Sequence, residues 1–287
     1  GMFFEDMGIT YLGPVDGHDI RKLYKTFQEA KRVDHAVLVH VLTKKGKGYG
    51  PAEENPSRFH GIVPFDIETG EAKEKSSKDS YTDIFSKVFC DIAKQNDAVV
   101  GITAAMADGT GLARFARMFP DRFFDVGIAE EHALTFAAGL AAGGLKPVVA
   151  VYSSFLQRAF DQAIHDVCLQ NLPVMIAVDR AGLVGSDGET HQGLFDLSFL
   201  NMIPNMTILS PKNRWEMADM VRFCADFQYP VALRYPRGAA YEGLSAFRTP
   251  IVYGKSEILY EEEDIAVIFV GHMAELAVQV RDRLKEI

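Results

Sequence analysis

Two apolar runs decide the fold of this chain: Val148-Val149-Ala150-Val151-Tyr152 and Val174-Met175-Ile176-Ala177-Val178. Between them, Arg158 to Gln170 has the spacing of a helix. Strands that are apolar throughout, separated by helices, are typical of a parallel sheet covered on both faces. The sequence therefore predicts an α/β fold at this point.

The same alternation continues on both sides of this unit. Further strands are predicted at residues 98–104, 123–128, 207–209 and 231–233. Further helices are predicted at residues 81–94, 130–142 and 214–225. Together they predict one α/β domain over residues 81–238, with a parallel sheet flanked by helices. Ligands of such sheets bind at the carboxyl ends of the strands, so we expect the chemistry there.

The flanking segments predict parts of two other domains. Residues 1–64 read as the end of an α/β domain, because a helix at 20–30 precedes a strand at 36–42. Polar linkers are expected at 65–80 and 239–255. Residues 256–287 hold a strand at 264–271 and a helix from Ala274, a pair that cannot bury both its faces. We expect the start of a third domain here, and a chain that is a fragment of a longer protein.

The composition is that of an ordinary soluble protein. Of 287 residues, 48% are hydrophobic and 24% charged, and the net charge of −9 argues against broad binding to nucleic acid or to anionic membranes. We find no apolar run of membrane-spanning length and no signal peptide, so a cytoplasmic protein is expected. Cys90, Cys168 and Cys224 lie too far apart for a zinc site or a disulfide framework, and we expect buried thiols.

An acidic pair, Glu130 and Glu131, follows the predicted strand that ends at Ile128. One interpretation is that both are first-turn acids of a helix, each favoured by its dipole by about 0.3–1 kcal/mol. The other is a carboxylate at a strand end that is partly desolvated and able to donate or accept a proton. Spacing alone leaves both interpretations open.

Other polar and aromatic side chains follow later strands. Tyr152 and Phe155 come at the end of one strand, where aromatic residues serve as core or as a platform for a cofactor. After the next strand, three polar side chains are expected to face one strand-end crevice: Arg180, Asp187 and His191. Arg237 follows the last strand and suits a phosphate or carboxylate, with a surface ion pair as the alternative.

Eight short strings resemble the 1-deoxy-D-xylulose-5-phosphate synthase family of transketolase-like enzymes. In chain order they are Pro14-Val15-Asp16-Gly17-His18-Asp19, Thr43-Lys44-Lys45-Gly46-Lys47-Gly48-Tyr49, Phe119-Pro120-Asp121-Arg122, Ile128-Ala129-Glu130-Glu131-His132-Ala133, Phe155-Leu156-Gln157-Arg158-Ala159-Phe160-Asp161-Gln162, Asp179-Arg180-Ala181-Gly182, Thr190-His191-Gln192-Gly193 and Tyr235-Pro236-Arg237-Gly238. The resemblance extends over nearly the whole chain, and several strings distinguish this family from ordinary transketolases.

The resemblance implies roles for individual residues. Glu130 would hydrogen-bond the aminopyrimidine ring of thiamine diphosphate and act in catalysis, and Phe155 would stack on that ring. Ile128 and Tyr152 would complete the cofactor contacts. His191 and His60, a histidine of the interdomain segment, would also be catalytic. The substrate-binding positions implied by the family are Tyr152, Arg158, Arg180, Asp187, His191 and Arg237, with Lys47 as a contact near the entrance.

The resemblance also implies a reaction and its partners. The family condenses pyruvate with glyceraldehyde 3-phosphate, with loss of CO2, to a precursor of isoprenoids, thiamine and pyridoxal, and its members are homodimers. It holds Mg²⁺ with a Gly-Asp-Gly motif and a later Asn on an N-terminal segment. Ser186-Asp187-Gly188 imitates that motif but lacks the first glycine, so no metal ligand is predicted in this chain. The alternative is a catalytically silent fragment or subunit whose partner carries the diphosphate and magnesium site.

Overall fold

The computed structural model divides into two compact parts, Gly1–Lys75 and Ser76–Ile287. The structure describes residues 1–62, 64–73 and 78–286. Residues 63, 74–77 and 287, which fall in the predicted first domain, first linker and third domain, lie outside the described residues. The predicted domain boundaries stay predictions.

The first part contains a strand–helix–strand unit. β1 (Thr10–Asp16) pairs in parallel with β2 (Val37–Leu42), and α2 (Ile20–Ala30) connects them. The sequence pattern predicted α2 and β2 but missed β1, because Gly13-Pro14 interrupts it and the pairing register shifts between Leu12 and Val15. Two short helices, α1 (Met2–Asp6) and α3 (Gly50–Glu54), complete this part.

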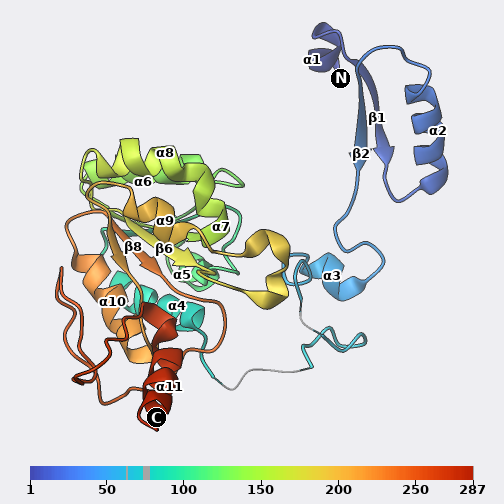
Figure 1. Cartoon of the computed structure of the whole chain (residues 1–287). Coiled ribbons are helices and arrows are strands. Elements are labelled where there is room, and N and C mark those ends of the chain that lie inside the picture. Colours follow the sequence, from blue (N-terminus) through green and yellow to red (C-terminus); the bar gives the residue numbers. More distant parts are fainter. Residues whose placement is uncertain (63, 74–77, 287) are drawn as a thin grey trace. The chain divides into compact units, whose positions relative to one another are not determined.

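Within the described residues of the second part, six strands form one parallel sheet in the order β4-β3-β5-β6-β8-β7. The neighbouring strands β6 and β8 are labelled in Figure 1. The strands are β3 (Val99–Thr103), β4 (Phe123–Asp125), β5 (Lys146–Tyr152), β6 (Met175–Asp179), β7 (Thr207–Leu209) and β8 (Val231–Arg234). The predicted parallel sheet flanked by helices is confirmed. From β3 the chain first moves to the edge strand β4 and then returns to the other side of β3 for β5. The order therefore reverses between β3 and β5, the place where such sheets bind ligands.

Both faces of this sheet are buried, as the continuous apolar strands predict. One face packs against α4 (Tyr81–Ala93), α5 (Leu112–Met118) and α10 (Arg214–Asp226). The other packs against α6 (Glu130–Ala142), the helical segment 153–168 and α9 (Asp196–Asn201). Neighbouring residues of one strand, such as Val148 and Val149 of β5, belong to different cores. The three cysteines are buried in these cores, and burial raises the pKa of the Cys168 thiol to about 12.

The predicted helix at 158–170 is helical from Ser153, but it changes type along its length. It runs through α7 (Ser153–Leu156), a 3-10 turn at Gln157–Ala159, α8 (Phe160–Gln162) and a π-helical turn at Ala163–Cys168. Such changes of hydrogen-bond pattern inside a helix often occur at functional sites. Periodicity alone did not reveal them.

The strand predicted at 264–271 is wrong. Residues 264–270 form no strand in the described part of the chain, and Gly271–Met273 form a 3-10 turn before α11 (Ala274–Leu284). Its apolar residues stay exposed, with Ile268 92% and Ile265 60% accessible. A strand needs a neighbour for its backbone hydrogen bonds, and no described strand pairs with this segment.

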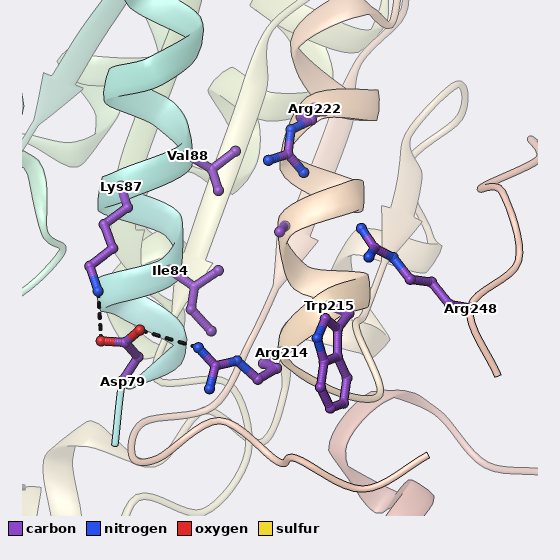
Figure 2. A pocket seen from close by; sticks show the side chains of 9 residues that line it. Asp79, Ile84, Lys87, Val88, Arg214, Trp215, Arg222 and Arg248 are labelled. Carbon is purple, nitrogen blue, oxygen red and sulfur yellow. Dashed lines mark hydrogen bonds and ion pairs between the residues drawn. The ribbon is translucent and has the colours of Figure 1, made fainter. Parts of the chain in front are cut away.

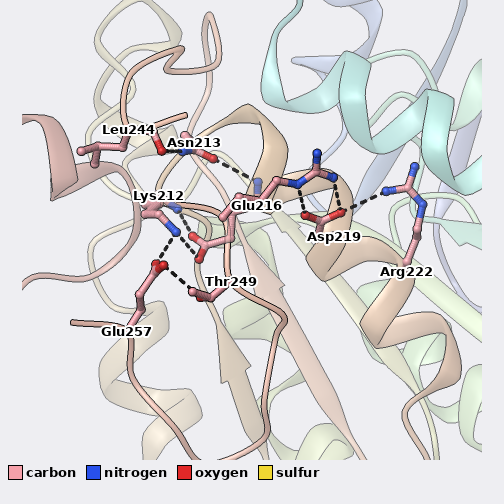
Figure 3. A network of polar contacts seen from close by, with 9 residues as sticks. Lys212, Asn213, Glu216, Asp219, Arg222, Leu244, Thr249 and Glu257 are labelled. Atoms are coloured by element: carbon pink, nitrogen blue, oxygen red, sulfur yellow. Dashed lines mark hydrogen bonds and ion pairs between the residues drawn. The ribbon is translucent and has the colours of Figure 1, made fainter. Parts of the chain in front are cut away.

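Polar contacts at the start of α10 hold the segment that follows the sheet (Figure 3). The buried Lys212 ammonium donates to Glu216 at 2.8 Å and to Glu257 at 2.5 Å. The Asn213 side chain accepts from the Glu216 backbone N–H at 3.0 Å and donates to the Gly243 carbonyl at 3.1 Å. One asparagine therefore caps α10 and also fixes the chain near residue 243.

We predict that Asn213→Ala lowers the free energy of unfolding of the second part by about 1–3 kcal/mol, because both the cap and a buried amide donor are lost. Asn213→Ser keeps a cap oxygen and should lose about half as much. Trp215, the single tryptophan, lies on α10, so urea unfolding followed by its fluorescence measures this part of the chain. Equal losses in the two variants would show that the cap contributes nothing.

Candidate active site

A tight turn after β4 positions Glu130. The Asp125 carboxylate accepts from the Ala105 backbone N–H at 2.8 Å and from the Gly127 N–H at 3.0 Å. Gly127 has φ +72°, in the left-handed region that glycine adopts without strain. After this turn α6 begins at Glu130, so the carboxylate stands at the carboxyl end of a strand and at the start of a helix.

The Glu130 side chain is buried, with 3% exposure. Its Oε1 accepts a hydrogen bond from Arg158 Nη1 at 2.6 Å. Its Oε2 is also buried, and among the described residues it has no hydrogen-bond partner. Leaving a buried polar atom without a partner costs about 1–3 kcal/mol, more when it is charged. The unpaired oxygen therefore marks a place where a ligand can donate a hydrogen bond.

Aromatic rings lie next to this carboxylate. Tyr152 and Phe155 stack with ring centroids 5.7 Å apart and planes at 19°. The His191 ring meets the Phe155 ring edge-on at 5.1 Å. The Arg158 guanidinium lies 5.0 Å from the centre of the Phe155 ring while it holds Glu130. Arg158 thus joins the carboxylate to the aromatic group. A carboxylate beside an aromatic face suits a flat nitrogen-containing ring, which can stack on the face and donate a hydrogen bond to the carboxylate.

Arg180 occupies the end of β6 in a left-handed conformation, with φ +59°. Its guanidinium lies 4.1 Å from the Tyr152 ring centre and donates to the Gly109 carbonyl at 2.5 Å. It also pairs with the fully buried Asp179 at 3.0 Å. Burial raises the pKa of the Asp179 carboxyl, and the charge of Arg180 opposes that rise.

Asp187 lies between two guanidinium groups. It contacts Arg237 Nη1 through one oxygen, and its other oxygen is 3.5 Å from Arg180 Nε. The second distance is an ion pair without a hydrogen bond, since both atoms lack a hydrogen-bond partner among the described residues. Two arginines that converge on one carboxylate are also placed to take the oxygens of a phosphate.

Two glycine contacts bring the loops of this site together. The Gly182 and Gly193 backbones exchange N–H···O bonds of 2.8 and 2.9 Å. A Cβ on Gly193 would lie 2.3 Å from the Arg180 carbonyl oxygen, and a Cβ on Gly109 would lie 1.8 Å from the Tyr152 hydroxyl. At Gly193 the obstacle is backbone, so only glycine fits there and the loops carrying Arg180 and His191 can approach closely; at Gly109 a larger residue would displace the Tyr152 hydroxyl.

The structure brings together most residues that the sequence singled out, although their roles stay predictions. The grouped residues are Glu130, Tyr152, Phe155, Arg158, Arg180, Asp187, His191 and Arg237. Ile128 is 80% exposed in the turn before α6. His60 and Lys47 belong to the first part of the chain and are exposed there.

Sequence reasoning assigned no role to three residues that shape the site. Asp179 anchors Arg180, and Gly109 and Gly193 allow the close approach of the loops. Gly109 belongs to Asp108-Gly109-Thr110-Gly111, a loop after β3 whose two glycines were the available signal. In the described ranges no three His, Cys, Asp or Glu side chains gather to hold a metal ion. Nor is any helix of those ranges long and apolar enough to cross a membrane.

The sheet topology, the buried carboxylate and the adjacent aromatic pair define a transketolase-like domain. The family model of the transketolase pyrimidine binding domain matches residues 77–242, and the model of 1-deoxy-D-xylulose-5-phosphate synthase matches residues 1–43. The chain belongs to the transketolase pyrimidine-binding family, and along its whole length it is similar to the 1-deoxy-D-xylulose-5-phosphate synthases. The resemblance seen in the short strings is confirmed.

The similar proteins agree with this assignment. The 1-deoxy-D-xylulose-5-phosphate synthase of Lachnoclostridium phytofermentans is 58% identical over 287 residues, which are 100% of this chain and 46% of the relative. That of Aquifex aeolicus is 52% identical over 99% of this chain and 45% of its own length. The chain thus spans about half the length of these relatives.

Solved structures show the same fold. A split-gene transketolase, described as an inactive β4 tetramer, matches with TM-score 0.64 and 27% identity over 73% of this chain and 68% of its own. The transketolase of Campylobacter jejuni matches with TM-score 0.53 and 18% identity, over 83% of this chain and 48% of its own. At that identity the second match shows the fold alone.

We predict that Gly193→Ala destabilises the second part by about 1–3 kcal/mol, because the new methyl group pushes against the Arg180 carbonyl and separates the paired loops. Gly139→Ala is the matched control, since Gly139 lies in α6 with no atom within 4 Å of an added Cβ. The control should be neutral or gain up to about 1 kcal/mol. Thermal unfolding of the two variants measures the difference, and equal stability would contradict the close approach.

Proposed function

We propose that this chain is part of a 1-deoxy-D-xylulose-5-phosphate synthase, which condenses pyruvate with glyceraldehyde 3-phosphate and releases CO2. The observation that carries the proposal is the buried Oε2 of Glu130, which has no hydrogen-bond partner among the described residues, on a carboxylate that Arg158 links to Phe155. The identity of 50% or more to such synthases along the whole chain supports it.

The residues present fit the aminopyrimidine half of thiamine diphosphate. Oε2 of Glu130 would accept a hydrogen bond from the ring, while Arg158 fixes the other oxygen. Phe155, already stacked with Tyr152, would offer its face to the ring. When bound, the cofactor supplies the stabilised carbanion that this class of reaction needs. The protein contributes the position of the ring and the site of one proton.

The arginines at the strand ends would receive the phosphorylated substrate. Arg180 and Arg237 both reach Asp187, and a phosphate could take the place that the carboxylate now occupies between them. His191 stands edge-on to Phe155 and beside Tyr152, where it would hydrogen-bond the reacting oxygens. Burial raises the pKa of the Tyr152 hydroxyl, which favours its neutral, donating form.

Further parts of the proposal rest on the family resemblance. They are Mg²⁺ bound by a segment outside this sequence, a homodimer, a cytoplasmic location, and roles in isoprenoid and thiamine synthesis. His60 as a catalytic residue and Ile128 as a cofactor contact belong with them. The alternative, a silent fragment or a subunit that needs a partner, is not favoured by the whole-chain identity. Product formation is measured for this chain alone and for a full-length protein that contains it. Product from the full-length protein supports the synthase, and no product from either supports the silent alternative.

We predict that Glu130→Gln in the full-length enzyme lowers kcat by at least about 100-fold, because a carboxamide cannot hold or release the proton. Glu131→Gln is the matched control, since this neighbouring acid is exposed and should leave turnover unchanged. Urea unfolding followed by circular dichroism checks that both variants stay folded. Normal turnover in Glu130→Gln would remove Glu130 from the mechanism.

We predict that Arg237→Ala raises the KM for glyceraldehyde 3-phosphate by about 10-fold or more and that for pyruvate much less. The reason is the loss of a charge-assisted contact to phosphate, worth about 1.5–3 kcal/mol. Arg117→Ala removes an exposed arginine of α5 and serves as the control. Steady-state kinetics with each substrate varied in turn gives the two KM values. An equal rise for both substrates would rule out a phosphate contact.

A further inference from the structure

A groove of about 370 Å³ lies between α4 and α10, and it shares no residue with the candidate active site. Its apolar wall comes from Ile84 and Val88 of α4 and from Trp215 of α10 (Figure 2). Arg248 reaches it from the segment after the sheet. A volume of this size is in the range of small-molecule sites.

Four cations line the groove: Lys87, Arg214, Arg222 and Arg248. They are held in place by two shared carboxylates. Asp79 accepts from Lys87 Nζ at 2.7 Å and pairs with Arg214 Nη2 at 3.3 Å. Asp219 accepts from Arg248 Nε at 2.8 Å and from Arg222 Nη1 at 3.3 Å. Each carboxylate therefore holds two cations in place but balances the charge of only one of them.

The groove keeps a positive excess in a chain whose net charge is −9. The four cations outnumber the carboxylates Asp79 and Asp219 by two. Glu242 also pairs with Arg214, but its charge is balanced by Lys78. Hydrogen bonding to Asp219 raises the pKa of Arg248, and hydrogen bonding from Lys87 lowers the pKa of Asp79, so these groups stay ionised at neutral pH. The local charge suits a ligand that carries about two negative charges.

Arg222 and Arg248 are placed to meet such a ligand. Both point toward the same carboxylate, and their side chains are 57% and 53% exposed. Arg222 donates to Asp219 through Nη1, and Arg248 donates to it through Nε and Nη2. Each guanidinium has further N–H donors, and their fork geometry matches phosphate oxygens.

Trp215 gives the groove a second kind of contact. It is half-buried on α10, and its indole stands between Arg214 and Arg248 (Figure 2). Stacking of a nucleobase on an aromatic ring is worth about 1–3 kcal/mol. We propose that this groove binds a nucleotide, with its phosphates at Arg222 and Arg248 and its base on Trp215. The site is separate from the proposed reaction and does not depend on it.

The test is a titration of the chain with ADP, followed by the fluorescence of Trp215 and by calorimetry. Trp215 is the single tryptophan, so its signal comes from the groove itself. Arg222→Gln and Arg248→Gln should each weaken ADP binding by about tenfold or more. Inorganic phosphate should bind about tenfold weaker than ADP, because it has no ring to stack.

Two variants separate the groove from other anion sites. Arg237→Gln removes a guanidinium of the strand-end site, and Lys94→Gln removes a cation just after α4 that pairs with Asp91 and does not line the groove. Both should bind ADP as the unaltered chain does. The proposal is overturned if ADP causes neither a fluorescence change nor heat. It is also overturned if binding survives both groove substitutions, is lost in Arg237→Gln, or is equally strong for inorganic phosphate.

Discussion

Burial of both faces of the parallel sheet is the constraint on which the rest of this molecule depends. Because α4, α5 and α10 cover one face and α6, α9 and the 153–168 segment the other, the strand interiors are apolar throughout. Polar side chains are excluded from the middle of the sheet and collect where strands end. Glu130, Tyr152 and Arg180 all occupy such ends, and so the fold itself selects the place of the chemistry.

Residues at the strand ends are then held by one another rather than by solvent. Arg158 bonds Glu130 and lies against Phe155, and Arg180 lies on Tyr152 while it contacts Asp179 and the Gly109 carbonyl. Each guanidinium thus joins a carboxylate to an aromatic ring. The Gly182–Gly193 pairing sets the distance between the two loops involved. Oε2 of Glu130 is buried and has no hydrogen-bond partner among the described residues. A buried acceptor of this kind needs a donor, and a bound ligand can supply it.

The strands and long helices of the second part could be predicted because their patterns are long and repeat. Glu130 to Ala142, for example, was predicted with the bounds that α6 has. Two segments misled the pattern: Gly13-Pro14 hides β1, and the apolar run at 264–271 looks like a strand although no described strand pairs with it. The polar site residues were visible from type and position. Gly109 and Gly193 were not, because their importance lies in atoms that approach from distant segments, Tyr152 and Arg180. His60 belongs to a separate part of the chain, so its role stays a prediction.

Helix α4 connects the candidate active site with the groove. Its Thr82 hydroxyl donates to Asp179 at 2.7 Å, and Asp179 pairs with Arg180 at the strand end. Ile84, Lys87 and Val88 of the same helix line the groove. The helix starts at a capping box formed by Ser80 and Asp83. This capping box stabilises the first turn of the helix, which carries Thr82. Thr82 therefore lies on the same helix as the groove residues and begins the row of contacts that runs through Asp179 to Arg180.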